Sequence, residues 1–313
     1  MATPLLEAER KTAARDLTSD LDLTVENVLS LLDLAAQMKR NPGRFTRALA
    51  GQYLSLLFEK PSLRTRLTFE LAIKQLGGDC VANAGPIGDR EPVKDIARNL
   101  DRWTNAIVAR TFSQTTIEEL ARWSKVPVIN ALSDLYHPCQ ALADMLTLKE
   151  KFGKLRALKL VFVGDGNNVA HSLMLSSARM GMHFTLAHPR GYEPDATITA
   201  EAMNLAKESG GQIAITRDAA SAVNGANAVY TDVWTSMGQE EESAKRRADF
   251  GPFQVNEELF ALARTDAVFM HCLPAKRGEE TTDGVLECSR SVVFDQAENR
   301  LHVQKALLLM MLS

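Results

Sequence analysis

Three residues with phosphate-binding side chains follow an apolar run early in the chain. The segment FEKPSLRTRLTFE (58–70) places Ser62, Arg64 and Thr65 directly before a helical pattern. If Ser62 caps that helix, the backbone amides of the first turn, including that of Leu63, face an anion that the helix dipole favours. Arg64 adds a planar fork of donors suited to phosphate oxygens. An ordinary helix cap beside two surface arginines explains this motif equally well.

The segment HPCQ (137–140) places two further polar side chains at a helix start. His137 and Gln140 stand at positions i and i+3, where both can point into one site, and Pro138 suits the first helical turn. A histidine in this position is more often a cap or a packing residue than a catalyst. We expect Cys139 in the core. No set of His and Cys has metal-ligand spacing, so we expect no metal ion.

The segment GDGNN (164–168) follows an apolar run and opens a helical pattern, which invites a dinucleotide interpretation. It lacks the third glycine of GxGxxG, and no acidic residue ends the next apolar run, so that signal is weak. Asn167 and Asn168 could cap the helix or bind a carboxylate.

Two later segments offer groups for an amine substrate. DVWTSMG (232–238) combines Asp232 with Ser236 and a loop glycine, a fair receptor for an ammonium group. HCLP (271–274) sets Cys272 between an apolar run and a proline turn, where it is a reactive thiolate or, more commonly, an inert buried cysteine. No Ser/His/Asp triad is evident.

These polar segments stand at the ends of predicted strands. Short β-rich runs occupy 53–58, 106–112, 127–132, 158–166, 183–189, 212–218, 226–234 and 267–274. Helical patterns begin at Ser62, Val93 and Thr116 and after His137, and another covers 196–211. Such alternation predicts parallel βαβ units, whose ligands bind beyond the carboxyl ends of the strands. We therefore expect the polar segments, with Arg110 among them, to line one cleft.

Length and composition predict two α/β domains. The 313 residues exceed the usual size of one core, and 45% hydrophobic with 24% charged residues is typical of a globular protein. We place the boundary near 148–157, giving domains at 1–150 and 151–297, both with doubly wound parallel sheets. The apolar segment 298–313 is expected to form a buried helix that packs back on the first domain.

Charge and cysteine usage limit the partners and the compartment. A net charge of −3 and a pI near 6.1 provide no basic field for nucleic acid or an anionic membrane. The N-terminal segment has no apolar core of a secretory signal, and no run is long enough to span a bilayer. The four cysteines lack disulfide spacing. We expect a cytoplasmic protein with reduced thiols.

Seven segments taken together resemble the ornithine carbamoyltransferases. They are FEKPSLRTRLTFE, VARTFS, HPCQALADMLT, GDGNNVAHSLM, DVWTSMGQE, HCLPAKRGEE and VVFDQAENRLHVQKA, in the order and approximate spacing of that family. The first and third resemble carbamoyltransferases in general, whereas the segments containing SMG and HCLP point to ornithine over aspartate. The resemblance covers the chain from about residue 50 to the C-terminus.

The resemblance implies carbamoyl transfer from carbamoyl phosphate to the δ-amine of L-ornithine, giving citrulline and phosphate without metal or organic cofactor. It implies catalytic roles for Arg64, Arg110, His137 and Cys272. The implied carbamoyl phosphate contacts are Ser62, Leu63, Arg64, Thr65, Arg110, His137, Gln140, Cys272, Leu273 and Arg300. The implied ornithine contacts are Asn168, Asp232, Ser236 and Met237. The family also implies closure between two domains and homotrimers, or multiples of trimers, that share sites across interfaces.

Two positions depart from the family pattern. Leu63 replaces a hydroxyl residue, which is tolerated if that position acts through its amide. Pro86, in the loop 83–91, replaces a glutamine that usually contacts carbamoyl phosphate. Proline has no side-chain donor and no N–H, so we consider Arg90 of the same loop as a substitute donor, against a surface arginine paired with Asp89 or Glu91.

Three other functions remain open from the sequence. They are carbamoyl transfer to putrescine or an acylated ornithine, ligand binding without turnover, and a nicotinamide-dependent oxidation that rests on GDGNN alone. An intact Asp232 and SMG argue against the first, because they imply a free α-amino group. The sequence does not distinguish arginine synthesis from arginine breakdown and does not fix the number of trimers.

Overall fold

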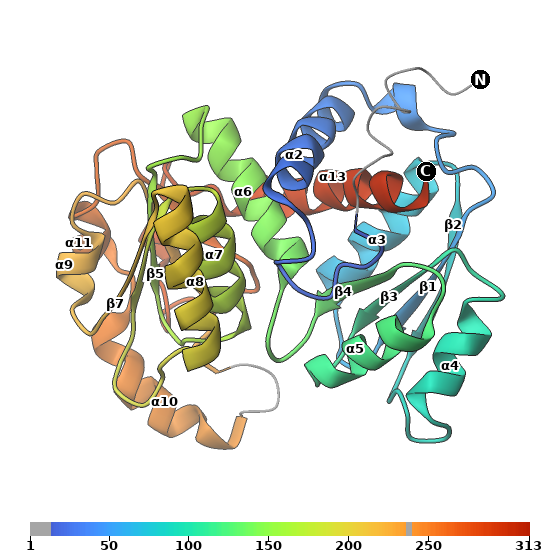
Figure 1. The fold of residues 1–313 in the computed structure, drawn as a ribbon. Coiled ribbons are helices and arrows are strands. Elements are labelled where there is room, and N and C mark those ends of the chain that lie inside the picture. Colours follow the sequence, from blue (N-terminus) through green and yellow to red (C-terminus); the bar gives the residue numbers. More distant parts are fainter. Residues whose placement is uncertain (1–13, 236–239) are drawn as a thin grey trace. The chain divides into compact units, whose positions relative to one another are not determined.

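The structure, a computed structural model, describes residues 14–235 and 240–313. These residues form two compact units (Figure 1). The first comprises the described residues up to Leu146 together with Glu298–Ser313, and the second comprises Thr147–Ala297. The cleft predicted between two domains stays a prediction.

The first unit contains a four-stranded parallel sheet with strand order β2-β1-β3-β4. Its strands are β1 (Tyr53–Phe58), β2 (Asp79–Ala84), β3 (Ala106–Arg110) and β4 (Val128–Leu132). The sequence did not reveal β2. This strand lies at the sheet edge, and its Val81 side chain is 69% exposed, so burial imposes no apolar pattern on it.

Helices cover this sheet (Figure 1). They are α2 (Val25–Arg40), α3 (Leu63–Gln75), α4 (Val93–Leu100), α5 (Gln114–Trp123), the start of α6 (Pro138–Phe152) and the end of α13 (Val293–Leu312), with a 3-10 turn at Pro42–Phe45. One core cluster joins residues of β1, β3 and β4 to α4 and α5. The end of α13 is tied to α2 by Lys39 Nζ donating to Asn299 Oδ1 at 2.8 Å and to α3 by Lys305 Nζ donating to Gln75 Oε1 at 3.2 Å.

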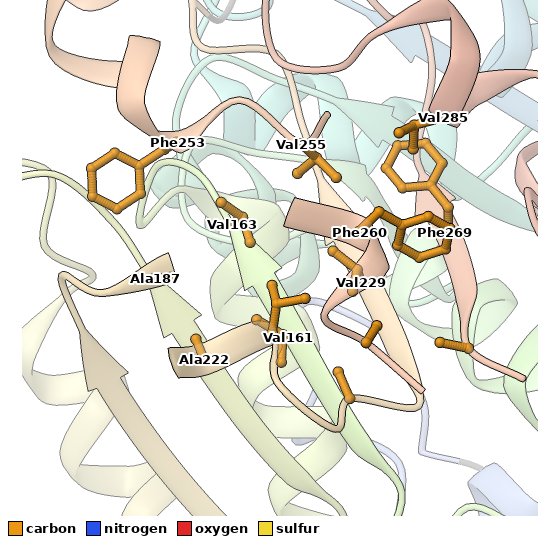
Figure 2. Packing of buried hydrophobic residues seen from close by; sticks show 14 of the residues in the cluster. Val161, Val163, Ala187, Ala222, Val229, Phe253, Val255, Phe260, Phe269 and Val285 are labelled. Atoms are coloured by element: carbon orange, nitrogen blue, oxygen red, sulfur yellow. The ribbon is translucent and has the colours of Figure 1, made fainter. Parts of the chain in front are cut away.

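The second unit contains a five-stranded parallel sheet with order β7-β6-β5-β8-β9. Its strands are β5 (Lys159–Val163), β6 (His183–Ala187), β7 (Gln212–Thr216), β8 (Ala228–Thr231) and β9 (Val268–His271). Its helices are α7 (Asn168–Arg179), α8 (Ala196–Ser209), α9 (Ala219–Val223), α10 (Ser243–Phe250), α11 (Glu257–Ala261) and α12 (Asp283–Leu286), with 3-10 turns at Glu240–Glu242 and Gly251–Phe253. Figure 2 shows the core on one sheet face, where valines of β5 and β8 meet Phe253, Phe260 and Phe269.

Both sheets have a topological switch point. In the first, the chain reverses its direction of strand addition between β1 and β3, and in the second between β5 and β8. Loops that leave two such strands diverge to opposite faces, so the sheet edge between them is open to a ligand. The prediction of two parallel-sheet α/β domains with a returning C-terminal helix is confirmed.

Element boundaries differ from the predictions by a few residues. The strand predicted at 53–58 matches β1, and the other predicted strands exist but are shorter at one or both ends. Helix α5 begins at Gln114 rather than Thr116, and α13 begins at Val293 rather than at 298. Helix α8 ends at Gly210, whose φ of 79° is a left-handed conformation that favours glycine. None of the described helices combines the length and the apolar character that a membrane span requires.

The core cluster of the second unit provides a stability test. Phe269 is fully buried and packs edge-on against Phe260, with ring centroids 6.0 Å apart. Phe269→Ala should lower the free energy of unfolding by about 3–5 kcal/mol, because it removes apolar contacts and leaves a cavity. Phe294 is 65% exposed, so Phe294→Ala should change it by no more than about 0.5 kcal/mol. Urea unfolding measures both, and equal losses would contradict this packing.

Candidate functional site

The N-terminus of α3 presents free backbone amides in the first unit. Ser62 occupies the N-cap position with an extended backbone, φ −154° and ψ 103°. Ser62 thus holds the N-cap position considered from the sequence, and the helix starts where predicted, but the Ser62 hydroxyl makes no capping hydrogen bond. The first amides of a helix have no partner within the helix, and here the cap supplies none. They remain for water or a ligand.

The charges around this helix start favour an anion. The first turn of α3 contains no acidic residue. Arg66 pairs with Glu70 at 2.7 Å, whereas the Arg64 guanidinium has no partner among the described residues. A cation at the N-terminus of a helix is opposed by the helix dipole, and a bound anion reverses that unfavourable balance. Leu63, beside it, is 71% exposed and can offer only its backbone.

Two buried guanidinium groups converge on Thr65. Arg110 Nη1, at the end of β3, lies 3.5 Å from Thr65 Oγ1, and Arg300 Nη2, in α13, donates to the same oxygen at 3.1 Å. Arg300 Nη1 also donates to Gln140 Oε1 at 2.5 Å, and Gln140 Nε2 donates to Asp144 at 2.8 Å. The structure thus brings together predicted residues from α3, β3, α6 and α13. Two positive groups around one neutral hydroxyl suit a phosphate.

His137 is neutral in this setting. Burial, followed by the charges of Arg300 and Arg110, lowers the pKa of His137 well below 6.5. The ring is therefore uncharged at neutral pH and can still donate one hydrogen bond. Lys60, which the sequence did not single out, has its pKa lowered first by burial and then by Arg110, as expected in a positive field. Cys139 is fully buried, as predicted, and burial raises its thiol pKa to about 12.

Asp232 is the centre of the corresponding group in the second unit. It follows β8 and is 8% exposed. Its Oδ2 accepts from Asn167 Nδ2 at 3.0 Å, and its Oδ1 accepts from the Val233 amide at 2.8 Å and from Cys272 Sγ at 3.0 Å. Three donors hold the carboxylate in one orientation. A fixed carboxylate is suited to an ammonium group.

The loop after β5 contributes helix α7 and its cap. Asn167 Oδ1 accepts from the amides of Val169 and Ala170 at 3.0 and 3.1 Å, so of the two roles left open by the sequence Asn167 has that of the helix cap. Asn168 is the first residue of α7. Gly166 has a packing reason, since a Cβ there would stand 2.3 Å from Pro194 N. The glycine that suggested a dinucleotide site is therefore required by a neighbouring loop of the same chain.

Cys272 and Leu273 follow β9. The Cys272 thiol donates to Asp232, so its proton stabilises the carboxylate and the sulfur is placed as a partner of the acid. Leu273 has φ 55°, in the left-handed region that residues with a Cβ rarely adopt. Ser236 and Met237, the other expected ornithine contacts, lie outside the described residues.

A residue that the sequence analysis did not single out fixes the positions of these loops. Arg246, 5% exposed, donates from Nη1 to Asp165 at 2.6 Å and to the Trp234 carbonyl at 2.9 Å, joining the loops after β5 and β8. Burial raises the pKa of Asp165, and the Arg246 charge opposes that rise. Arg246 also pairs with Glu242 one helical turn away at 3.0 Å. The two partners through which it joins the loops lie 81 and 12 positions away, so no local pattern marks that role.

Asp232, His271 and Cys272 have the ligand types of a metal site. One ligand atom from each lies within 4.8 Å of the others. Both ring nitrogens of His271 already make hydrogen bonds, to the Leu273 amide and to Glu280. The Cys272 thiol is directed at Asp232. These hydrogen bonds explain the grouping, and we assign no metal to it.

The loop that contains Pro86 and Arg90 is exposed. The Ile87 amide donates to Glu59 Oε1 at 3.0 Å, and the Phe112 amide donates to Glu59 Oε2 at 2.7 Å. Glu59 therefore fixes the start of this loop to the ends of β1 and β3. Arg90 forms no ion pair with Asp89 or Glu91 in the part of the chain that the structure describes.

Two family models match nearly the whole chain. Residues 15–150 match the aspartate/ornithine carbamoyltransferase carbamoyl-P binding domain, and residues 156–311 match the Asp/Orn binding domain of that family. The chain is 50% identical over 305 residues to an ornithine carbamoyltransferase of Listeria monocytogenes (strain F2365), covering 96% of each. It is 50% identical over 301 residues to that of Thermococcus kodakarensis, covering 95% of the chain and 96% of the relative.

Solved structures agree with these matches. Ornithine carbamoyltransferase from Pyrococcus furiosus superposes with a TM-score of 0.93 at 47% identity, covering 96% of this chain and 97% of that one. Acetylornithine transcarbamylase complexed with acetylcitrulline gives 0.86 at 32% identity, covering 95% and 99%.

The neutral state of His137 predicts a pH dependence of stability. The unfolded chain takes up a proton on this ring as the pH falls through about 6.5, whereas the folded protein does not, because its pKa lies well below that value. The free energy of unfolding should therefore fall on acidification, with a slope from this residue of at most about 1.4 kcal/mol per pH unit. His137→Gln should be less sensitive. Urea unfolding between about pH 7.5 and about pH 5.5 measures this, and equal slopes for both proteins would contradict it.

Proposed function

The chain belongs to the aspartate/ornithine carbamoyltransferase family, and from this premise we propose that it transfers the carbamoyl group of carbamoyl phosphate to the δ-amine of L-ornithine, giving L-citrulline and phosphate. The observation that carries this proposal is the convergence of Arg110 and Arg300 on Thr65 at the open N-terminus of α3. This arrangement suits a phosphate, and it occurs in the part of the chain that matches the carbamoyl-P binding domain.

The chemistry requires charge stabilisation more than a nucleophile. As the neutral δ-amine attacks the carbonyl carbon, negative charge develops on the carbonyl oxygen and on the departing phosphate. Arg64, Arg110 and Arg300, with the α3 amides of Leu63 and its neighbours, bind the phosphate. His137 donates a hydrogen bond to the carbonyl oxygen, because its lowered pKa keeps the ring neutral. Ser62, Thr65 and Gln140 complete the contacts to carbamoyl phosphate.

The second unit binds the amine substrate. Asp232, fixed by three donors, receives the α-ammonium of ornithine, with Asn168, Ser236 and Met237 as further contacts. Cys272 and Leu273 adjoin the reacting groups, and Cys272 acts through its hydrogen bond and forms no covalent intermediate. We assign carbamoyl phosphate to residues 1–150 with the helix 298–313, and ornithine to residues 151–297.

We further propose a homotrimer or a multiple of trimers. Leu63, Leu67 and Leu71 are spaced four residues apart along α3 and are 71%, 46% and 45% exposed. Val81 on the edge strand β2 is 69% exposed. Apolar side chains gathered in this way are typical of a surface between subunits. A cytoplasmic role in arginine metabolism is supported by four free cysteines and by the substrates proposed.

An amine panel tests the function. Purified protein with carbamoyl phosphate should form citrulline from L-ornithine with kcat/KM about 100-fold above that for putrescine, which lacks the α-ammonium and α-carboxylate. Asp232→Asn should raise KM for ornithine at least about tenfold, because a charge-assisted bond is lost, and leave carbamoyl phosphate binding by calorimetry unchanged. Asp218→Asn, which keeps a helix cap in the same unit, is the control. A preference for putrescine or N-acetylornithine would replace ornithine as the substrate.

The loop of Pro86 gives a second test. Arg90, exposed and unpaired within the described residues, is proposed to supply the donor that Pro86 lacks, at a site of a neighbouring subunit. A charge-assisted bond of about 1.5–3 kcal/mol corresponds to about one to two orders of magnitude in affinity. Arg90→Ala should weaken carbamoyl phosphate binding by that amount in calorimetry. Unchanged affinity would remove this role, and tighter binding by Pro86→Gln would show a site that simply lacks a contact.

A further inference from the structure

A buried histidine and glutamate lie behind the loop of Cys272 and Leu273. His271 Nε2 and Glu280 Oε1 are 3.1 Å apart, and both side chains are fully inaccessible to solvent. They therefore cannot touch a substrate. We propose that His271 and Glu280 are positioning residues, which fix the backbone of Leu273 and, through it, the Cys272 thiol. The identity of the ligand that meets this loop rests on the proposed function.

The hydrogen bonds determine which nitrogen of His271 carries the proton. The Leu273 amide donates to Nδ1 at 2.8 Å, so Nδ1 has no hydrogen. The proton is on Nε2 and is donated to Glu280 Oε1 at 3.1 Å. Glu280 thus selects the tautomer that leaves Nδ1 as an acceptor for the Leu273 amide. The imidazole ring of His271 therefore connects the Glu280 carboxylate to the Leu273 amide by two hydrogen bonds.

Glu280 also holds the other end of the loop. Its Oε1 accepts from the Lys276 amide at 2.5 Å, so a single carboxylate oxygen fixes the chain on both sides of residues 272–275. The Glu280 carbonyl accepts from the Val255 amide at 2.9 Å, and Val255 belongs to the core cluster in Figure 2. Through Glu280 the loop is therefore anchored to the hydrophobic core of the unit.

The backbone of Leu273 needs such support. Its φ of 55° is unfavourable for a residue with a Cβ and persists only where surrounding contacts determine it. The bond from the Leu273 amide to His271 is one such contact, and the packing of the Leu273 side chain against the core cluster is another. Without the first, Leu273 can relax toward negative φ, and the adjoining Cys272 then leaves its position 3.0 Å from Asp232 Oδ1.

The burial of Glu280 supports a role other than stability. Its Oε2 is buried and has no hydrogen-bond partner among the described residues. A buried carboxylate with an unsatisfied oxygen is costly, and an apolar side chain would pack there at lower cost. The acid is explained if its two-sided hold on the loop serves the chemistry at Cys272 and Leu273.

Two conservative replacements of His271 separate its two bonds. In Asn the side-chain oxygen reaches the position of Nδ1, so His271→Asn keeps the acceptor for the Leu273 amide. In Gln the side-chain nitrogen reaches the position of Nε2, so His271→Gln keeps the donor to Glu280 and loses the Leu273 bond. With carbamoyl phosphate and ornithine, His271→Gln should lower kcat/KM by about 100-fold, as expected for a displaced contact. His271→Asn should retain most activity.

Matched variants address Glu280 and stability. Glu280→Leu removes both bonds that Glu280 Oε1 accepts, so its kcat/KM should fall as far as that of His271→Gln. Glu280→Gln keeps an acceptor oxygen, so its kcat/KM should stay close to that of the parent. Thr281→Val removes a neighbouring buried hydrogen bond, from Oγ1 to the Val255 carbonyl at 3.1 Å, that does not reach the loop. It should lower the melting temperature without changing kcat or KM. Equal kinetic losses in His271→Gln and Thr281→Val would indicate a structural role only and overturn the proposal.

A measurement without turnover tests the same geometry. Alkylation of Cys272 by iodoacetamide, followed by peptide mass spectrometry, should be about tenfold faster in His271→Gln than in the parent, because the thiol loses its fixed position. Cys288 in the same unit reports general loosening and should not change. An unchanged Cys272 rate would overturn the proposal even if the parent forms no citrulline. A parent without citrulline formation would overturn the proposed function and leave this result to decide the positioning role.

Discussion

The arrangement of the first unit depends on the contacts of two buried guanidinium groups, those of Arg110 and Arg300, with the Thr65 hydroxyl. A buried charge is costly unless hydrogen bonds offset it, and Thr65 and Gln140 accept such bonds from the buried Arg110 and Arg300. Arg300 comes from the C-terminal helix, which must lie against α2 and α3 to deliver it. The returning helix is thus part of the proposed phosphate site. The hydrogen bonds of this helix to Lys39 and Gln75 hold it in the position that places Arg300 beside Thr65.

The two sheets leave their strand ends accessible to a ligand in the same way. Each has a switch point, between β1 and β3 in one unit and between β5 and β8 in the other. The loops leave such a pair of strands in opposite directions. The helices that follow therefore do not cover the polar residues at the strand ends, which stay accessible to a ligand. Arg110 and Asp232 both stand directly at or after strands of these pairs. In the first sheet the pairing of β3 with β4 also shifts register between Ala109 and Arg110.

The second unit differs in how its polar groups are held. Asp232 takes its orientation from three donors, and the loops that supply those donors are fixed by buried residues that never reach the surface of the site. Arg246 joins the loops after β5 and β8, and His271 with Glu280 holds the loop after β9. A carboxylate that is proposed to recognise an ammonium group benefits from this arrangement, because an acid already held in one orientation loses little freedom on binding. The unusual backbone of Leu273 belongs to the same network.

The sequence by itself determined the βαβ alternation, most strands and the segments that carry polar groups, because hydrophobic periodicity and helix caps act within a few residues. It missed β2, whose exposed edge carries no periodic pattern, and could not show that Ser62 leaves its helix uncapped. Only the tertiary structure decided which groups meet. Arg300 and Thr65 are 235 positions apart, and Arg246 and Asp165 are 81 apart. Such hydrogen bonds depend on the packing of whole elements, which local residue patterns do not encode.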